Sequence, residues 1–188
     1  MFEHKSRLTQ EEWAELVKSG EMSLKRVKNF FFECMVKGWA SGAEAELFSF
    51  GYKGYQFREE KENSKLVLMD AYCVGDDGNS SGFTSIRYDE SPVLWTMYYL
   101  GEYSKEAIPI LKEALLKAYQ DRKFYGGRGI NLDDGKYEYC NDIGAYSQKD
   151  PFLFFQGKER IEEISIGALE PDIKGWHEYM GKVLVNFE

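Results

Sequence analysis

The chain has 188 residues, of which 43% are hydrophobic and 30% are charged, a composition that is typical of globular proteins and excludes a disordered chain. Its formal net charge of −8 argues against a general nucleic-acid binder, because such proteins present a basic face to the phosphates. Aromatic residues make up 16% of the chain, a share that favours strands and aromatic-lined surfaces.

The same inventory indicates neither a metal site nor a membrane span. Cys34, Cys73 and Cys140 are far apart and form no Cys-x-x-Cys pair, so a zinc or redox motif has no support. Residues 1–6 are charged and lack an apolar signal segment, and no run approaches the roughly 18 apolar residues of a membrane span. We therefore expect a cytoplasmic protein without metal or cofactor.

Three helices are predicted. Thr9 to Glu12 forms a capping box that opens a short helix ending at Gly20, and residues 1–22 form an N-terminal extension too short for a helix-turn-helix DNA reader. Ser23 caps a second helix that ends at Gly38 and has one apolar stripe. The third helix runs from Ser104 to Tyr119, with Pro109 in its first turn.

Strand patterns follow the second and third helices. The stretch Tyr55–Gly101 is rich in strand-forming residues, with a turn predicted over Gly75–Gly82. The strands expected are Lys65–Tyr72, Phe83–Tyr88, Val93–Leu100, Tyr137–Asn141, Phe152–Ile161 and Trp176–Val185.

The two halves of the sequence, about 23–103 and 104–188, match approximately. Each begins with an amphipathic helix, Asp70 precedes Phe83 by 13 residues, and Asn141 precedes Phe154 by 13. Each half ends in a cluster that we call the closing cluster: Trp95, Tyr99 and Gly101 in the first half, and Trp176, Tyr179 and Gly181 in the second. The tryptophan slips by one residue between the copies, and a longer loop over 168–175 interrupts the second half. We predict one α+β domain over 23–188, built from two helix-plus-three-strand units with antiparallel sheet and helices on one face.

Several motifs stand out together: Phe30-Phe31, Trp39 to Gly42, Asp70-Ala71-Tyr72, Trp95 to Gly101 after Pro92, and Phe155 to Ile161. From about Phe30 to Leu184 the chain resembles an uncharacterised bacterial domain family, often found C-terminal to helix-turn-helix modules in predicted transcriptional regulators. The resemblance implies a stand-alone version of a domain without established activity, with a sensing role by analogy. The order of elements is also similar to the duplicated effector-binding domains of bacterial drug-sensing regulators, which hold small, often cationic ligands between aromatic walls and an acidic residue.

A cleft between two similar halves is a common place for a ligand. The closing clusters are the aromatic candidates to line it, and acidic and basic side chains would supply charge; alternatively, each of these aromatic residues fills the core. The predicted ligand-binding residues are Trp95, Tyr98, Tyr99, Trp176, Tyr179, Asp70, Glu159 and Arg128.

Other motifs are better explained as structural. The loop Phe124–Gly129 lacks the Lys-Ser/Thr of a phosphate loop and opens no helix, so it is predicted as a tight turn that carries Arg128. The Asp76–Asn79 segment is predicted as a surface turn rather than a calcium loop, because Arg87 stands where the closing glutamate of a calcium loop belongs. His4 and His177 are the only histidines, and no sequence partner marks either as catalytic.

Three functions remain open, of which a small-molecule-binding, effector-sensing module is favoured. A hydrolase using Asp70 and Glu159 as paired carboxylates requires both side chains to face one pocket. A protein-interaction domain, such as a homodimer, requires a contiguous exposed apolar patch.

Overall fold

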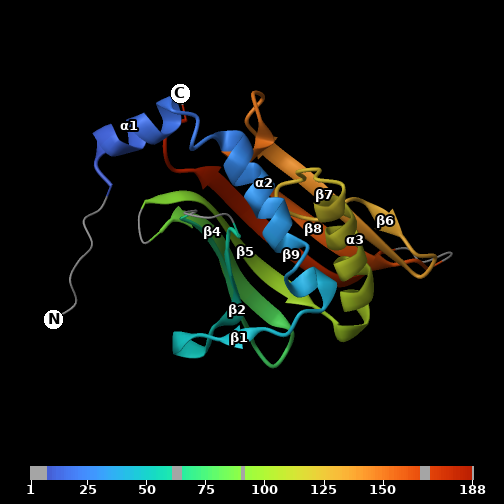
Figure 1. Ribbon diagram of the computed structural model, residues 1–188. Helices are drawn as coiled ribbons and strands as arrows, with labels where there is room; N and C mark the ends of the chain where they lie inside the picture. The colour runs from blue at the N-terminus through green and yellow to red at the C-terminus, as the bar shows by residue number, and fades with distance from the viewer. Residues whose placement is uncertain (1–7, 61–64, 90–91, 166–169, 188) are drawn as a thin grey trace.

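The computed structural model describes residues 8–60, 65–89, 92–165 and 170–187 of the chain. Within these residues the fold is α+β, with three α-helices and one antiparallel sheet of nine strands in the order β1-β2-β3-β4-β5-β9-β8-β7-β6 (Figure 1). The helices are α1 (Gln10–Lys18), α2 (Leu24–Met35) and α3 (Ile108–Gln120). The strands are β1 (Glu46–Leu47), β2 (Lys53–Arg58), β3 (Leu66–Val74), β4 (Asn79–Tyr88), β5 (Val93–Tyr103), β6 (Leu132–Asp133), β7 (Tyr137–Tyr146), β8 (Phe154–Glu163) and β9 (Asp172–Val183).

The sheet consists of two meanders that meet at its centre. Strands β1 to β5 pair in chain order, strands β6 to β9 do the same, and β5 pairs with β9. Tyr99 of β5 lies directly opposite Tyr179 of β9, so the two closing clusters are brought together at the middle of the sheet. α2 precedes the first meander and α3 the second, which is the predicted order, but the meanders contain five and four strands rather than the three expected in each unit.

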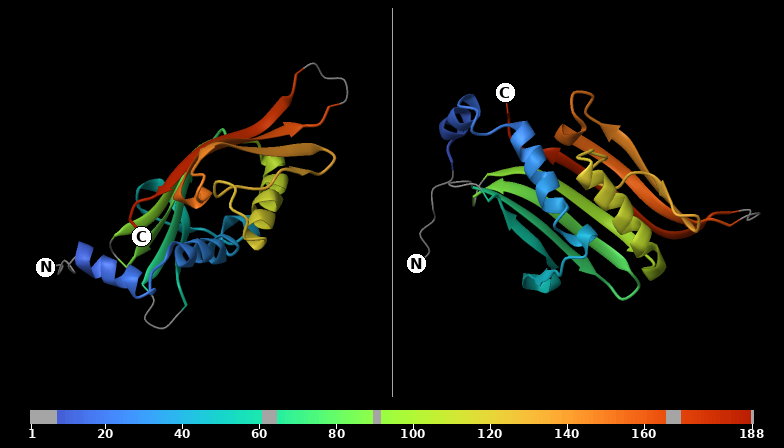
Figure 2. Two further views of the ribbon diagram at one scale, coloured as in Figure 1. Left: turned by 90° about the horizontal axis from the view of Figure 1, so that it is seen from above. Right: turned by 45° about the vertical axis from the view of Figure 1, so that its right-hand side comes forward.

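Both long helices, α2 and α3, lie on the same face of the sheet, and the other face carries no helix (Figures 1 and 2). Strand residues alternate between these faces, so Trp95, Met97 and Tyr99 point toward the helices while Thr96, Tyr98 and Leu100 point away. The core fills the space between the sheet and the helices. It includes Val27, Phe30, Phe31 and Phe32 of α2, and Ile110, Leu111, Ala114, Leu115, Ala118 and Tyr119 of α3.

The sequence signals for helix ends are confirmed, with small shifts in position. Thr9 forms the capping box of α1, and Ser23 caps α2 by accepting a hydrogen bond from the Arg26 backbone N–H. α3 begins later than predicted because Lys105–Ala107 forms a 3-10 turn, η3, before the helix. Pro109 does occupy its first turn.

The turns are shorter than the sequence suggested. Strand β4 begins at Asn79, because Gly78 adopts a φ of +80° and allows the chain to reverse at once. The loop predicted over 168–175 lies partly outside the described residues, and from Asp172 onward the chain is already strand β9. β1 and β6 were not predicted, because strands of two residues are too short to show alternation. β2 was not among the strands expected either, and only its part from Tyr55 onward falls in the stretch predicted as rich in strands.

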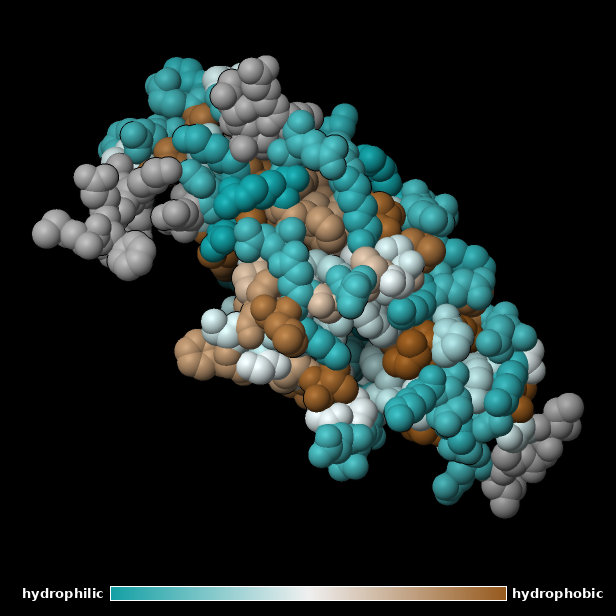
Figure 3. All heavy atoms as spheres, turned by 60° about the horizontal axis from the view of Figure 1, so that its bottom comes forward, coloured by the Kyte–Doolittle hydropathy of each residue, from teal (hydrophilic) through white to brown (hydrophobic). Residues whose placement is uncertain are grey.

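Helix α1 lies apart from the sheet and contacts the end of the chain. Its Trp13 ring meets Phe187 edge-on at 5.6 Å, and Trp13 Nε1 donates to the Asn186 carbonyl at 2.8 Å. No helix in the described part of the chain is long and apolar enough to cross a membrane. The face shown in Figure 3 is mostly hydrophilic, with hydrophobic side chains gathered in small separate groups.

Candidate functional site

A cavity of about 390 Å³ opens on the helix-covered face of the sheet, which we call the helix-face cavity. Its base is formed by β3, β4, β5 and β9, and its sides by α3 and by the 3-10 turn η1 (Trp39–Ser41) that follows α2. The rings of Trp39, Tyr72, Tyr99 and Tyr103 line it. Four polar side chains that line it, Asp70, Thr84, Arg128 and His177, are buried.

Asp70 is the carboxylate of the helix-face cavity. Its Oδ1 accepts hydrogen bonds from Thr84 Oγ1 at 2.8 Å and from the Tyr99 hydroxyl at 3.3 Å. Among the hydrogen bonds of the described residues, none reaches Oδ2. Burial raises the pKa of Asp70, and the hydrogen bonds from Thr84 and Tyr99 oppose the rise. Asp70 lines the cavity, so this oxygen is available to hydrogen-bond a ligand there.

Arg128 lines the same cavity and forms a buried ion pair with Glu159 of β8. Arg128 Nε donates to Glu159 Oε1 at 2.8 Å, and Nη2 donates to the same oxygen. The hydroxyls of Tyr103 and Tyr139 donate to Glu159 as well, so both of its carboxylate oxygens are occupied. Burial alone would raise the pKa of Glu159, but the charge and hydrogen bonds of Arg128 lower it. Glu159 is therefore a charged, fully engaged group beneath the cavity.

The glycine-rich loop places Arg128. Gly126 and Gly127 have φ values of +64° and +71°, so the chain turns sharply and the Arg128 N–H bonds the Tyr125 carbonyl at 3.1 Å. A Cβ on Gly127 would lie 2.8 Å from Met97 Sδ, which explains why this close approach to the sheet requires glycine. The predicted tight turn is confirmed, and it aims the guanidinium at the centre of the sheet.

His177 completes this group, although the sequence showed no partner for it. Its Nε2 lies 2.8 Å from Ser80 Oγ, and Arg128 Nη2 lies 3.4 Å from its Nδ1. The ring reaches Ser80 across β5 because the residue between them in the sheet is Gly101. A Cβ on Gly101 would lie 2.4 Å from the His177 ring, so the glycine of the first closing cluster makes room for it.

Ser80, His177 and Glu159 resemble a nucleophile, a base and an acid, but the electrostatics oppose that role. Arg128 is a donor, so His177 Nδ1 accepts from it and Nε2–H donates to Ser80, the reverse of what activation of the serine requires. Burial and the Arg128 charge lower the pKa of His177 to about 3. A group with this pKa is too weak a base to take a proton from a serine hydroxyl, so His177 is poorly suited to activate Ser80.

The buried histidine leads to a prediction about pH. Unfolded His177 takes up a proton below its ordinary pKa of 6.5 while the folded residue stays neutral, so stability is complete above pH 6.5 and falls as the pH drops toward about 3. Between pH 7.5 and 5.0 we expect the wild type to lose about 2 kcal/mol more than His177→Gln. Urea unfolding at pH 7.5, 6.0 and 5.0 measures this, and parallel pH curves for the two proteins would contradict it.

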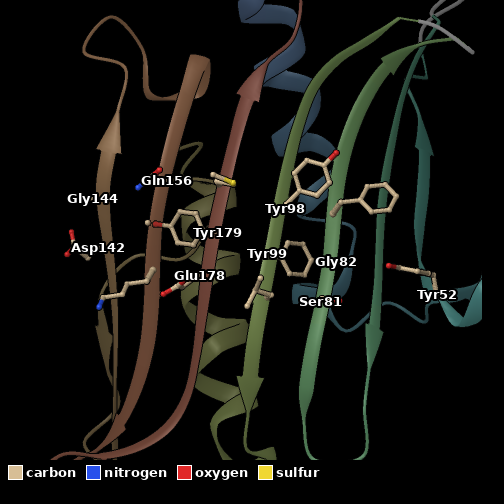
Figure 4. Close-up of a pocket in the computed structure, with 15 residues that line it drawn as sticks. Tyr52, Ser81, Gly82, Tyr98, Tyr99, Asp142, Gly144, Gln156, Glu178 and Tyr179 are labelled. Atoms are coloured by element: carbon tan, nitrogen blue, oxygen red, sulfur yellow. The ribbon is translucent and has the colours of Figure 1, made fainter.

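The helix-free face carries a second concavity, of about 660 Å³, over the centre of the sheet (Figure 4). Phe83, Tyr98 and Met180 lie side by side across three adjacent strands, and Tyr98 and Met180 are 56% and 51% exposed. Lys158 and Glu178, which pair across β8 and β9, lie beside this row. This surface therefore combines exposed apolar side chains with charges of both signs.

The predicted site residues are divided among three places. Tyr99, Asp70 and Arg128 line the helix-face cavity, and Glu159 lies beneath it. Tyr179 points to the same face, is 3% exposed, and donates to Asn141 Oδ1 at 2.5 Å. Tyr98 and Trp176 lie on the helix-free face, where Trp176 Nε1 donates to Glu102 at 3.1 Å.

Trp95 belongs to none of these surfaces. It is fully buried, stacks on Phe152 at 4.9 Å between ring centroids, and donates from Nε1 to the Phe152 carbonyl at 3.1 Å. The one-residue slip between the closing clusters has a direct consequence: Trp95 and Tyr99, four residues apart, share a face, whereas Trp176 and Tyr179, three apart, do not. The four aromatic residues therefore do not meet in one cleft.

Several residues of the helix-face cavity were not predicted as ligand-binding, namely Trp39, Tyr72, Ser80, Tyr103 and His177. Trp39 and Tyr72 belong to motifs that carry the family resemblance, whereas Ser80, Tyr103 and His177 belong to none. Cross-strand pairing and the turn after α2 bring the five residues together. Within the described ranges, no group of three or more histidine, cysteine and acidic side chains is placed to hold a metal ion. No protein-family model, no curated protein and no solved structure matches the chain.

Proposed function

We propose that the protein is a small-molecule-binding module whose ligand site is the helix-face cavity. The observation that carries this proposal is the buried carboxylate of Asp70, which lines a cavity with aromatic walls and keeps one oxygen free of hydrogen bonds from the described residues. A buried polar group is usually satisfied, and an accessible free acceptor inside an aromatic cavity fits a ligand donor. By the family resemblance, ligand binding would serve sensing rather than catalysis.

Ligand binding is tested with a thermal-shift screen of neutral and charged aromatic compounds. For any compound that stabilises the wild type, we expect Asp70→Asn to weaken binding by about tenfold or more, because an amide replaces the carboxyl group that bonds the ligand donor. Tyr99→Phe, which removes the hydroxyl that orients Asp70, should weaken binding less. Tyr98→Phe is the matched control, since it removes the neighbouring hydroxyl on the opposite face. If a compound binds the Asp70→Asn variant as tightly as the wild type, its binding site lies outside this part of the cavity.

The hydrolase alternative has less support. Asp70 and Glu159 point to the same face, as paired carboxylates would have to. The side chain of Glu159, however, is 0% exposed, and Arg128 and two tyrosines occupy its oxygens. A carboxylate in this state is available neither as a general base nor as a nucleophile.

The helix-free face supports a second candidate, contact with a second copy of the chain. The row Phe83–Tyr98–Met180, in which Tyr98 and Met180 are exposed and Phe83 is half-buried, offers apolar groups to the same surface of a partner. Lys158 and Glu178 beside it offer complementary charges. We expect the double variant Tyr98→Ser/Met180→Ser to be monomeric where the wild type dimerises, as measured by light scattering over a concentration series. Ile164→Ser, which changes an exposed apolar residue beyond the end of β8, is the control. A wild type that stays monomeric at high concentration would exclude this candidate.

We also propose that the two halves arose by duplication. Tyr99 and Tyr179 face each other at the centre of the sheet, and their hydroxyls bond Asp70 and Asn141, the pair matched in sequence. Each ring lies against a glycine, Gly82 or Gly157, where a Cβ would come within 2.6 or 2.5 Å of the hydroxyl. The match of Phe83 with Phe154 has no such support, because they pair with Tyr98 and Lys182.

A cytoplasmic location is also proposed, consistent with three free cysteines.

A further inference from the structure

The charges around the helix-face cavity differ in sign from the chain as a whole. Three lysines line it, Lys53 of β2, Lys105 of η3 and Lys112 of α3, against two carboxylates, Asp70 and Asp76. Arg128, the remaining cation of the lining, is already balanced by Glu159. The lining thus has an excess of positive charge, whereas the chain has a formal net charge of −8.

These charges are arranged by depth. Asp70 is 7% exposed and lies at the base of the cavity, whereas Lys105 is exposed and Lys53 and Lys112 are half-buried at the sides. Within the part of the chain that the structure describes, no carboxylate forms an ion pair with any of the three lysines. Their ammonium groups are therefore available to an anion at the mouth, where the local dielectric strengthens attraction relative to open solvent.

Two of these lysines lie over aromatic rings of the cavity wall. Lys53 Nζ is 5.4 Å from the centroid of Tyr72, and Lys112 Nζ is 4.8 Å from the centroid of Trp39. These contacts hold each ammonium beside an aromatic surface. A ligand whose ring packs against these walls would carry any substituent at its outer end toward the lysines.

From this arrangement we infer the class of ligand, an inference that rests on the proposed function of the cavity. We propose that the helix-face cavity binds a planar aromatic compound with an N–H donor on the ring and an anionic group, a carboxylate or a phosphate, at the other end. The ring lies between Tyr72 and Tyr99 and donates to Asp70, and the anion lies among Lys53, Lys105 and Lys112. The ligand charge is opposite to the cationic one that the similarity to drug-sensing domains implies.

The test is calorimetric titration of the full chain with three probes that share one ring and its N–H: indole-3-acetate, indole-3-acetamide and tryptamine. The acetate should bind about tenfold more tightly than the neutral amide, as expected for a few partly exposed ion pairs, and the cationic amine should bind most weakly. Raising the salt concentration should reduce the preference for the acetate, because exposed charges are screened. A second pair, adenosine 5′-monophosphate and adenosine, measures the gain in affinity from a phosphate. Comparing this gain with the gain from the carboxylate in the indole series shows which anion is preferred.

Variants locate the anion. Lys112→Gln should reduce the affinity for indole-3-acetate several-fold and leave that for indole-3-acetamide unchanged, since only the charged group contacts the lysine. Lys158→Gln, on the opposite face, is the control and should change neither. Equal binding of acetate and amide, stronger binding of tryptamine, or no binding in either series would overturn this inference. If these probes fail but other compounds bind and Asp70→Asn weakens their binding, the proposed binding function stands and only the ligand class is wrong. If no compound binds in this way, the proposed function is wrong as well.

Discussion

Replacing Arg128 by methionine is expected to lower the free energy of unfolding by about 3–5 kcal/mol at pH 7.5, because Glu159 would remain buried without its cation. The side chains of the pair are 8% and 0% exposed, so solvent screens little of the lost interaction. Tyr103 and Tyr139 still donate to Glu159, but neutral hydroxyls do not replace a guanidinium. Urea unfolding of the wild type and the variant measures the loss directly.

The pH dependence of this loss identifies its cause. In the variant, burial is no longer opposed by Arg128, so the pKa of Glu159 rises above its ordinary value. A carboxyl whose folded pKa is raised is stabilising below its unfolded pKa and destabilising as the pH rises through the folded value. The deficit of Arg128→Met should therefore be smaller at pH 5.0 than at pH 7.5. A deficit independent of pH would mean that lost packing, rather than uncompensated charge, accounts for it.

Two further variants control this experiment. Arg128→Met combined with Glu159→Gln removes both charges and should recover part of the stability, since no ion is left buried alone. Arg160→Met changes the residue next to Glu159 in β8, whose 45% exposed side chain pairs with Glu162 on the helix-free face. That pair lies at the surface, so its loss should cost about 1 kcal/mol or less.

The elements of the fold with long, regular patterns could be predicted from the sequence. The capping residues Thr9 and Ser23 mark the starts of α1 and α2, and the apolar stripe of α2 is the one that faces the core. The pairing of β5 with β9 could not be predicted, because no local pattern specifies which strands of two meanders meet. That single pairing decides the centre of the sheet and therefore what lies beside Tyr99.

The candidate site was predictable only in part, for the same reason. Composition and spacing marked Asp70, Tyr99 and Arg128 as candidates, and all three line the cavity. Glu159, marked with them, lies beneath the cavity in an ion pair with Arg128. His177 was missed because its partners, Ser80 and Arg128, are 97 and 49 residues away in the sequence. The only local trace of its position is Gly101, whose missing side chain makes space for the ring one strand away.

Trp95 and Trp176, which the sequence placed in equivalent closing clusters, are expected to differ sharply when replaced. Trp95→Ala should lower the free energy of unfolding by about 3–5 kcal/mol, since a fully buried indole is removed and a cavity is left. The indole stacks on Phe152 and Phe155 and meets Phe31 and Phe124 edge-on, so its loss removes packing contacts with four rings.

Trp176→Ala should cost about 1 kcal/mol or less, because this indole lies on the helix-free face and loses one hydrogen bond, to Glu102. Chemical unfolding of the two variants at one pH gives the comparison, and the tryptophan fluorescence of the folded proteins adds a second readout. Removing Trp95 should take away the blue-shifted emission of a buried indole, whereas removing Trp176 should take away more of the solvent-quenched component. Equal destabilisation by the two changes would mean that Trp176 also packs in the core, and would contradict its assignment to the opposite face of the sheet.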